Sequence, residues 1–152
     1  MRFWNVNGFG GAAADVVRFL SDEPCDVLVL IDSQLTDLET VRHYLPGWKL
    51  LHESRPHGTH KRRQFGGITV LWRPEKMRVW RECGDPKGML SFVTQDAAGL
   101  RRPVPVVALY NPPLVSRFNR GGKQWSNDVM GHVALEQARL VMQYGFVVVG
   151  GE

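Results

Sequence analysis

The chain has 152 residues, which is enough for one domain with a substantial hydrophobic core but short for two. Hydrophobic residues make up 43% of it and charged residues 22%, which excludes disordered, collagen-like and coiled-coil chains. The formal net charge is +4, and residues 1–45 are acidic on balance, so the remainder is clearly basic. A basic surface is typical of proteins that bind phosphates, although a solvated loop surface fits the charge equally well.

The sequence carries no signal for export or for a membrane. No apolar run approaches the roughly 18 residues of a spanning helix, and the N-terminus lacks a basic segment followed by an apolar one. Cys25 and Cys83 lie far apart, which favours reduced thiols over a disulfide or a zinc site. We therefore expect an intracellular protein that binds no membrane.

The first part of the chain predicts a strand, a helix and a second strand. Residues 1–6 run into a glycine-rich bend, and residues 12–21 carry apolar side chains at helical spacing. Residues 26–31 form a continuous apolar run, typical of a strand buried on both faces. In such a β-α-β unit, Asn5 and Asp32 stand at corresponding strand ends, so we expect both side chains at one rim of a sheet.

The middle of the chain predicts a helix and several strands. A helix over residues 35–44 and a strand over 48–52 are followed by a basic loop over 54–63. Residues 66–72 and 77–80 are rich in β-branched and aromatic side chains on either side of a Pro-Glu turn. We expect these two segments to pair as a hairpin.

The last part predicts a strand pair, a helix and a final strand. Residues 89–94 and 104–110 are expected to pair across a glycine, and the turn at 111–113 ends the pair because proline lacks the backbone donor. A helix beginning near residue 126 carries an apolar stripe, and residues 146–149 form the last apolar strand.

The order and spacing of five segments resemble the endonuclease/exonuclease/phosphatase superfamily. The segments are 4–8, 26–35, 66–68, 110–113 and 147–152. The Asn-Val-Asn-Gly opening and the Tyr-Asn-Pro-Pro turn look most like exonuclease-III-type repair nucleases and the endonuclease domains of non-LTR retroelements. The resemblance implies an α/β fold, a four-layer sandwich of two packed mixed sheets flanked by helices as in DNase I. It also implies a rim site for Mg²⁺ or Mn²⁺.

The resemblance carries active-site residues over to this chain. Asn5 matches the family's first active-site asparagine, and Tyr110 matches the tyrosine that orients or stabilises the phosphate. Asp32 stands where the family has a metal-binding glutamate, and it is one methylene shorter than that ligand. Glu152 stands where the family has the aspartate of a Gly-Asp-x-Asn motif, so it is predicted to be both catalytic and a metal ligand.

Substrate contacts are predicted beside these residues. Asn7 occupies the polar position next to the first asparagine, and the basic stretch after the last predicted turn faces the phosphates. The residues predicted to bind substrate are Asn7, Asn111, Arg117, Arg120 and Lys123. The spacing of His52, His57 and His60 matches no tight zinc pattern, so we expect solvated histidines or phosphate contacts there.

Each catalytic candidate also has a purely structural interpretation. Asn5 fits a turn cap, Asp32 fits a helix cap, Tyr110 fits an edge aromatic, and Glu152 fits a terminal residue without a role.

The predicted function is a divalent-metal-dependent phosphodiester hydrolase, a DNA endonuclease of the repair or retroelement type. The family's distal Ser-Asp-His segment, which carries the general base, would lie beyond residue 152. We therefore expect residues 1–152 to be an incomplete domain with impaired activity, whose missing C-terminal half is a partner or part of a larger polyprotein. Two alternatives stay open: an inactive fragment that at most binds nucleic acid through its basic loops, and a phosphatase for a non-nucleic phosphoester.

Overall fold

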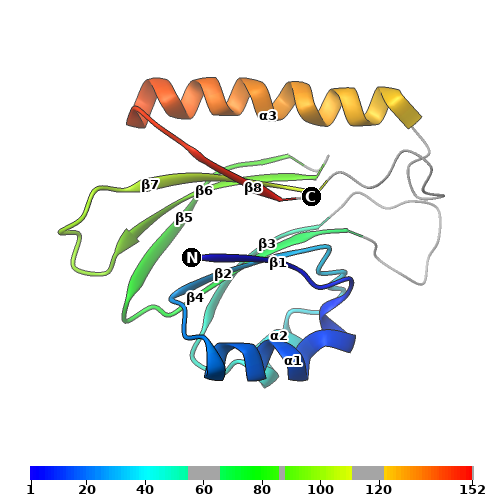
Figure 1. Ribbon diagram of the computed structural model, residues 1–152, viewed down its shortest axis with the longest axis vertical. Helices are drawn as coiled ribbons and strands as arrows, with labels where there is room; N and C mark the ends of the chain where they lie inside the picture. Colours follow the sequence, from blue (N-terminus) through cyan, green and yellow to red (C-terminus); the bar gives the residue numbers. More distant parts are fainter. Residues whose placement is uncertain (55–65, 86–87, 111–121, 152) are drawn as a thin grey trace.

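Two four-stranded sheets pack face to face, and helices cover the outer face of each (Figure 1). The computed structural model describes residues 1–54, 66–85, 88–110 and 122–151. Sheet A has the order β1-β2-β4-β3, with β1 at Arg2–Asn5, β2 at Val27–Ile31, β3 at Lys49–Glu53 and β4 at Ile68–Trp72. Sheet B has the order β5-β6-β7-β8, with β5 at Met77–Asp85, β6 at Met89–Asp96, β7 at Val104–Leu109 and β8 at Val148–Gly151. The helices are α1 at Phe9–Asp22, α2 at Glu39–Tyr44 and α3 at Gly122–Tyr144.

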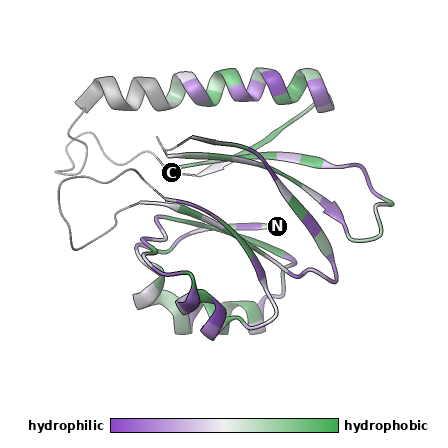
Figure 2. Ribbon diagram, turned by 180° about the vertical axis from the view of Figure 1, so that it is seen from behind, coloured by the Kyte–Doolittle hydropathy of each residue, from purple (hydrophilic) through white to green (hydrophobic). Residues whose placement is uncertain are grey.

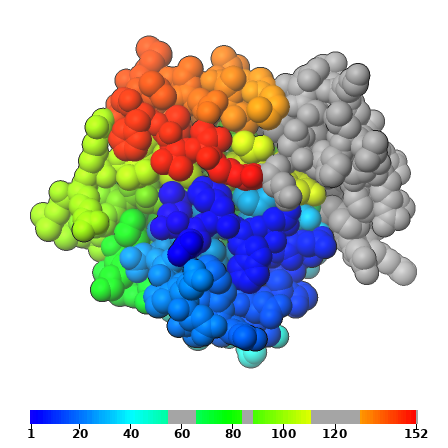
Figure 3. All heavy atoms as spheres, in the orientation of Figure 1, coloured from blue at the N-terminus to red at the C-terminus, as the bar shows by residue number. Residues whose placement is uncertain are grey.

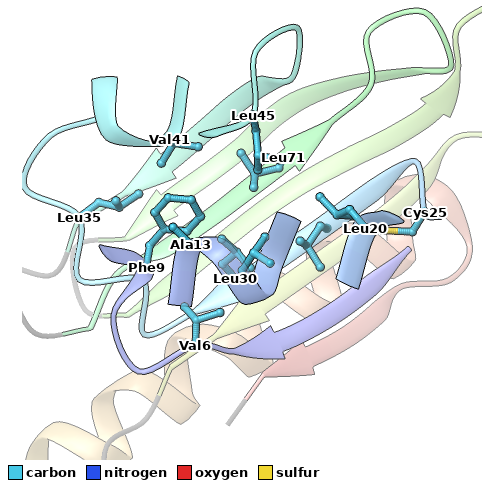
Figure 4. Close-up of a cluster of buried hydrophobic side chains, with 12 residues drawn as sticks. Val6, Phe9, Ala13, Leu20, Cys25, Leu30, Leu35, Val41, Leu45 and Leu71 are labelled. Atoms are coloured by element: carbon cyan, nitrogen blue, oxygen red, sulfur yellow. The ribbon is translucent and has the colours of Figure 1, made fainter. Parts of the chain in front are cut away.

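The strand β2 is buried on both faces because its side chains alternate between two cores. Leu28 and Leu30 pack with the apolar side of α1 and α2, where Phe9 is fully buried (Figure 4). Val29 points the other way, into the cluster that joins the sheets and contains Phe92 of β6. This arrangement confirms the strand buried on both faces that the continuous apolar run predicted.

The helix α3 covers the outer face of sheet B. Val133 and Leu140 pack against Met89 of β6 and Val107 of β7. Coloured by hydropathy, the described part of α3 alternates between apolar and polar bands, as a helix with one buried side does (Figure 2). With α1 and α2 on the far side of sheet A, this makes four layers and confirms the predicted α/β sandwich.

The opening β-α-β unit is also confirmed, because β1 pairs in parallel with β2 and Asn5 lies opposite Ile31. The expected hairpin of residues 66–72 with 77–80 is wrong. The strand β4 pairs with β2 on one side and β3 on the other, so it has no free edge for β5. Instead, β5 begins sheet B and pairs with β6, and the chain passes from one sheet to the other after Trp72.

The helices differ from their predicted bounds at the N-terminal ends. The first begins at Phe9 and not at residue 12, directly after Gly8, whose φ of 98° turns the chain out of the strand. The second covers Glu39–Tyr44, a shorter span than 35–44, and the Asp37 carboxylate accepts its first backbone N–H at 2.9 Å. The third begins at Gly122, before the predicted start. In the described part of the chain, no helix is long and apolar enough to cross a membrane.

Candidate functional site

The candidate site lies where β1 and β2 end side by side. Three backbone hydrogen bonds tie the segments that leave these strands: Val6 N to Ile31 O at 3.0 Å, Gly8 N to Asp32 O at 2.8 Å, and Phe9 N to Ser33 O at 2.8 Å. Because these bonds continue the parallel ladder past the strand ends, Asn5 and Asp32 stand at one rim of sheet A, as expected.

Four side chains at this rim, those of Asn5, Asn7, Asp32 and Gln34, form a hydrogen-bonded set that we call the rim network. The Asn7 backbone N–H donates to Asn5 Oδ1 at 3.0 Å. Gln34 Nε2 donates to Asn7 Oδ1 at 3.3 Å and to Asp32 Oδ2 at 3.1 Å. The backbone N–H of Gly66 donates to Asp32 Oδ1 at 2.7 Å. The network thus joins Asn5, the last residue of β1, and Asn7, in the loop that follows it (the first loop), to Asp32 and Gln34, in the loop that follows β2 (the second loop).

The backbone of the rim network is strained. The φ angles of Asn7, Asp32 and Gln34 are 45°, 54° and 51°, in the left-handed region that costs an ordinary residue about 1–2 kcal/mol. Backbone bonds from Gln34 N to Gly66 O at 2.8 Å and from Ser33 N to Gly67 O hold the second loop in place. Strain held by surrounding hydrogen bonds is typical of functional sites.

Asp32 is the buried carboxylate of the rim, with 7% of its surface exposed. Both of its oxygens accept a hydrogen bond, one from Gly66 and one from Gln34. Among the described residues, no three His, Cys, Asp or Glu side chains come close enough together to hold a metal ion. The role of Asp32 as a metal ligand remains a prediction.

A chain of hydroxyl groups lies beside Asp32. Thr69 Oγ1 donates to Ser33 Oγ at 2.9 Å, and His52 Nδ1 lies 2.9 Å from the same Thr69 oxygen. Both hydroxyl-bearing residues are buried, and a Cβ at Gly67 would lie 3.2 Å from Ser33 Oγ and 3.3 Å from His52 Cε1. Glycine at position 67 therefore leaves space for the side chains of Ser33 and His52.

His52 was expected to be solvated or to contact a phosphate, but its side chain is partly buried. It faces Thr69 across the β3–β4 pair and is half-buried there. Burial lowers the pKa of its imidazole because the charged form is poorly solvated.

Tyr110 directly follows β7, so it belongs to sheet B and not to the sheet that carries the rim network. Its backbone N–H donates to Gly88 O at 2.8 Å. The ring packs against the apolar cluster between the sheets, which also contains Ile31, the residue before Asp32. The fold therefore holds Tyr110 on the same inter-sheet core as the end of β2.

The remaining predicted site residues have no described side chain. Asn111, Arg117, Arg120 and Glu152 lie outside the described residues, as does the side chain of Lys123 in the first turn of α3. Sequence reasoning missed Ser33, Gln34 and Thr69. One sequence signal was available, namely a polar Asp-Ser-Gln triplet directly after a fully apolar strand.

Neither a protein-family model nor a curated protein matches the sequence. Solved structures do match. The catalytic domain of APE2 from Xenopus laevis superposes with a TM-score of 0.66 at 12% identity, over 99% of this chain and 56% of its own. The chain has the endonuclease/exonuclease/phosphatase fold.

Two further structures with this fold are similar to the chain. The 3' phosphatase NExo from Neisseria, bound to a product DNA hairpin, has a TM-score of 0.59 at 21% identity over 98% of this chain and 55% of its own. TDP2 from D. rerio, complexed with single-strand DNA product, has a TM-score of 0.58 at 14% identity over 90% of this chain and 53% of its own. The chain thus spans about half the length of these endonuclease/exonuclease/phosphatase-fold proteins.

Proposed function

We propose that the chain is the N-terminal half of a divalent-metal-dependent phosphodiesterase that acts on DNA, of the repair or retroelement endonuclease type. The observation that carries this proposal is the convergence of Asn5, Asn7 and Asp32 at one rim of sheet A. It occurs in a fold whose solved examples include a 3' phosphatase and AP endonucleases.

In this proposal the rim binds the phosphate that is cleaved. Asn5 and Asn7 are both exposed and present amide groups, which donate hydrogen bonds to phosphate oxygens. Tyr110 orients the phosphate from sheet B. Asn111, Arg117, Arg120 and Lys123 contact the DNA backbone, because arginine and lysine supply the charge that nucleic-acid binding requires.

The described residues do not by themselves fit a metal centre. Mg²⁺ takes about six oxygen ligands in near-octahedral geometry. Asp32 is the carboxylate at the rim, and the two hydrogen bonds it accepts take up part of its capacity. The proposed Mg²⁺ or Mn²⁺ therefore needs Glu152 of this chain together with further oxygen ligands from a complementing half. Hydrolysis also needs a general base, and the complementing half would supply it.

We assign the complementing half to an open flank of the sandwich. Within the described residues, β1 pairs with β2 alone and β8 with β7 alone, and the two strands lie next to each other (Figure 3). Val148 and Val149 of β8 are 36% and 39% exposed, and the strand carries no charge. An uncharged strand edge accepts a further strand readily, so sheet B has room to continue at β8.

The competing proposal is a fragment that binds DNA without cleaving it. The specific observation in its favour is that the described side chains contain no group of three or more His, Cys, Asp or Glu residues that could hold a metal ion. Binding through basic loops would be non-specific and would weaken steeply as salt is raised.

Plasmid nicking separates the two proposals. The purified chain is incubated with supercoiled plasmid and Mg²⁺ or Mn²⁺, alongside an EDTA control and an Asn5→Ala, Asp32→Ala double variant whose folding is checked by circular dichroism. EDTA-sensitive nicking that the double variant loses supports the hydrolase. Folded chain that nicks no faster than the double variant rejects it, and salt-sensitive DNA binding by fluorescence anisotropy then supports the binding fragment.

A further inference from the structure

The helix α3 has an exposed apolar side. It is the outermost layer of the sandwich, and its residues Val133, Glu136 and Leu140 face sheet B (Figure 1). On the side turned away from the sheet, Leu135 is 72% exposed and Met142 is 89% exposed. The exposed apolar residues in the described part of α3, which we call the outer stripe, are Met130, Gly131, Ala134, Leu135, Ala138, Val141 and Met142.

The outer stripe has the spacing of a contact between two helices. Gly131, Leu135, Ala138 and Met142 follow one another at intervals of four, three and four residues, which keeps them in one line along a helix. Small and large side chains alternate along this line. Each large side chain can therefore fill the space beside a small one on a facing helix.

A second copy of the stripe has the matching sequence of sizes. In an antiparallel pair of α3 helices about a twofold axis, Leu135 lies opposite Ala138 of the second copy, and Met142 lies opposite Gly131 of the second copy. A parallel pair would instead set Leu135 against Leu135 and Gly131 against Gly131. That pair is crowded at one level and leaves a void at another, which costs stability in both places.

The charges on α3 also fit a second copy. The outer stripe contains no Lys, Arg, Asp or Glu, and the charged residues between positions 130 and 144, Glu136 and Arg139, are paired with each other. Charges near a twofold axis would face charges of the same sign, which is costly, so a surface that binds itself has to be uncharged there. Antiparallel helices also place the positive N-terminus of each beside the negative C-terminus of the other.

We propose that the outer stripe is a dimer interface, at which α3 packs antiparallel against α3 of a second copy of this chain. This inference goes beyond the proposed function and does not rest on it, because the rim belongs to sheet A and α3 covers the outer face of sheet B. A standard interface uses about 20–30 residues a side. The outer stripe is much smaller, so the dimer is weak and forms at high concentrations of the chain.

Sedimentation velocity of the whole chain tests the dimer. The concentration is raised to about 500 µM, because small interfaces bind weakly. We expect a monomer–dimer equilibrium that Leu135→Ala weakens about tenfold or more, since a twofold interface loses each side chain twice. The matched control is Leu100→Ala, which removes a leucine that is 87% exposed in the turn between β6 and β7. This control should dimerise like the unsubstituted chain.

An exchange of sizes separates a fitted interface from a merely adhesive apolar surface. Ala138→Leu sets a second large side chain opposite Leu135, so it should weaken the dimer, whereas an adhesive surface would bind more tightly. The double variant Leu135→Ala, Ala138→Leu again sets a large side chain opposite a small one. It should recover most of the affinity that each single variant loses. Urea unfolding at low concentration, where the monomer predominates, checks that all three variants fold.

Three results would overturn the dimer. The first is a folded chain that stays monomeric over the whole concentration range, which would leave the outer stripe to a different partner. The second is association that continues past the dimer. The third is a double variant that binds no better than either single variant. Plasmid nicking reports on the rim alone, so its failure would reject the hydrolase and leave the dimer standing.

Discussion

At the scale of single residues, the rim is shaped by backbone hydrogen bonds more than by side-chain packing. Asn7 and Asp32 lie in loops whose N–H and C=O groups pair with each other or with Gly66 and Gly67. Such bonds hold the left-handed residues in place although each one is intrinsically unfavourable. The geometry of the rim therefore depends on two loops far apart in the sequence.

His52 should make the stability of the chain depend on pH. Burial lowers its pKa in the folded state, so the unfolded chain binds more protons between that lowered value and about 6.5. The stabilising contribution of neutral His52 is present above about pH 6.5, and it is lost as the pH falls through the lowered pKa. We expect the melting temperature to fall between pH 7.5 and pH 5.

A His52→Gln variant is the control for this prediction. Asp96 and Glu136 also have shifted pKa values, but both are lowered from ordinary acidic values and titrate below this window. The variant should therefore lose less of its melting temperature between pH 7.5 and pH 5 than the unsubstituted chain does. Equal losses would assign the pH dependence to other groups.

At the scale of elements, a buried carboxylate attaches α3 to sheet B. Glu136 accepts a hydrogen bond from Ser91 of β6 at 2.5 Å, and Arg139 donates to it at 2.7 and 2.8 Å. Arg139 also reaches Glu82 of β5 at 3.2 Å, and the Tyr144 hydroxyl donates to Glu82 at 2.9 Å. The hydrogen bonds from Arg139 and Ser91 lower the pKa of Glu136 despite its burial. The network orients the helix across two strands.

Removing this carboxylate should loosen α3. Glu136→Ala removes the nearer acceptor of the Ser91 hydroxyl, which is left with the Cys83 backbone oxygen at 3.3 Å, and it removes the closest partner of Arg139. The free energy of unfolding should therefore fall by about 2–4 kcal/mol. Urea denaturation measures the change. Leu135→Ala is the matched control on the outer side of the same helix, where Leu135 is 72% exposed, and it should change stability by about 0.5 kcal/mol at most. Equal effects of the two substitutions would show that the network does not anchor the helix.

At the scale of the whole molecule, the two sheets are in contact at the flank formed by β1 and β8. A Cβ at Gly150 would lie 2.6 Å from two carbons of the Phe3 ring. Phe3 belongs to sheet A and Gly150 to sheet B, so this ring fills the space between the sheets at their open edges. A side chain at Gly150 would push the edges apart.

Gly150→Ala should therefore destabilise the sandwich, by about 1–3 kcal/mol, as overpacking does. Gly131→Ala on α3 is a control of opposite sign, because a Cβ there meets nothing within 4 Å. Alanine in a helix interior should raise stability by about 0.5–1 kcal/mol relative to glycine. Urea titrations of both variants measure the difference, and a neutral Gly150→Ala would mean that Phe3 moves aside without cost.

The layers of the fold could be predicted from the sequence because buried segments show local patterns of apolar residues. The continuous apolar run of β2 indicated a strand with a core on each side, and that is its place. Strand partners are not local. The segments that form β4 and β5 have the composition of a hairpin, but β3 takes the edge of β4 that β5 would need.

The sequence by itself determined the α/β class, the β-α-β opening and the positions of Asn5 and Asp32 at matching strand ends, since periodicity and order carry that information. Only the tertiary structure decided which side chains contact one another at the rim. Gln34 reaches Asp32 and Asn7 because hydrogen bonds between two distant loops hold three residues in left-handed conformations. No single segment specifies such a conformation, because locally it is unfavourable and its compensation comes from elsewhere in the chain.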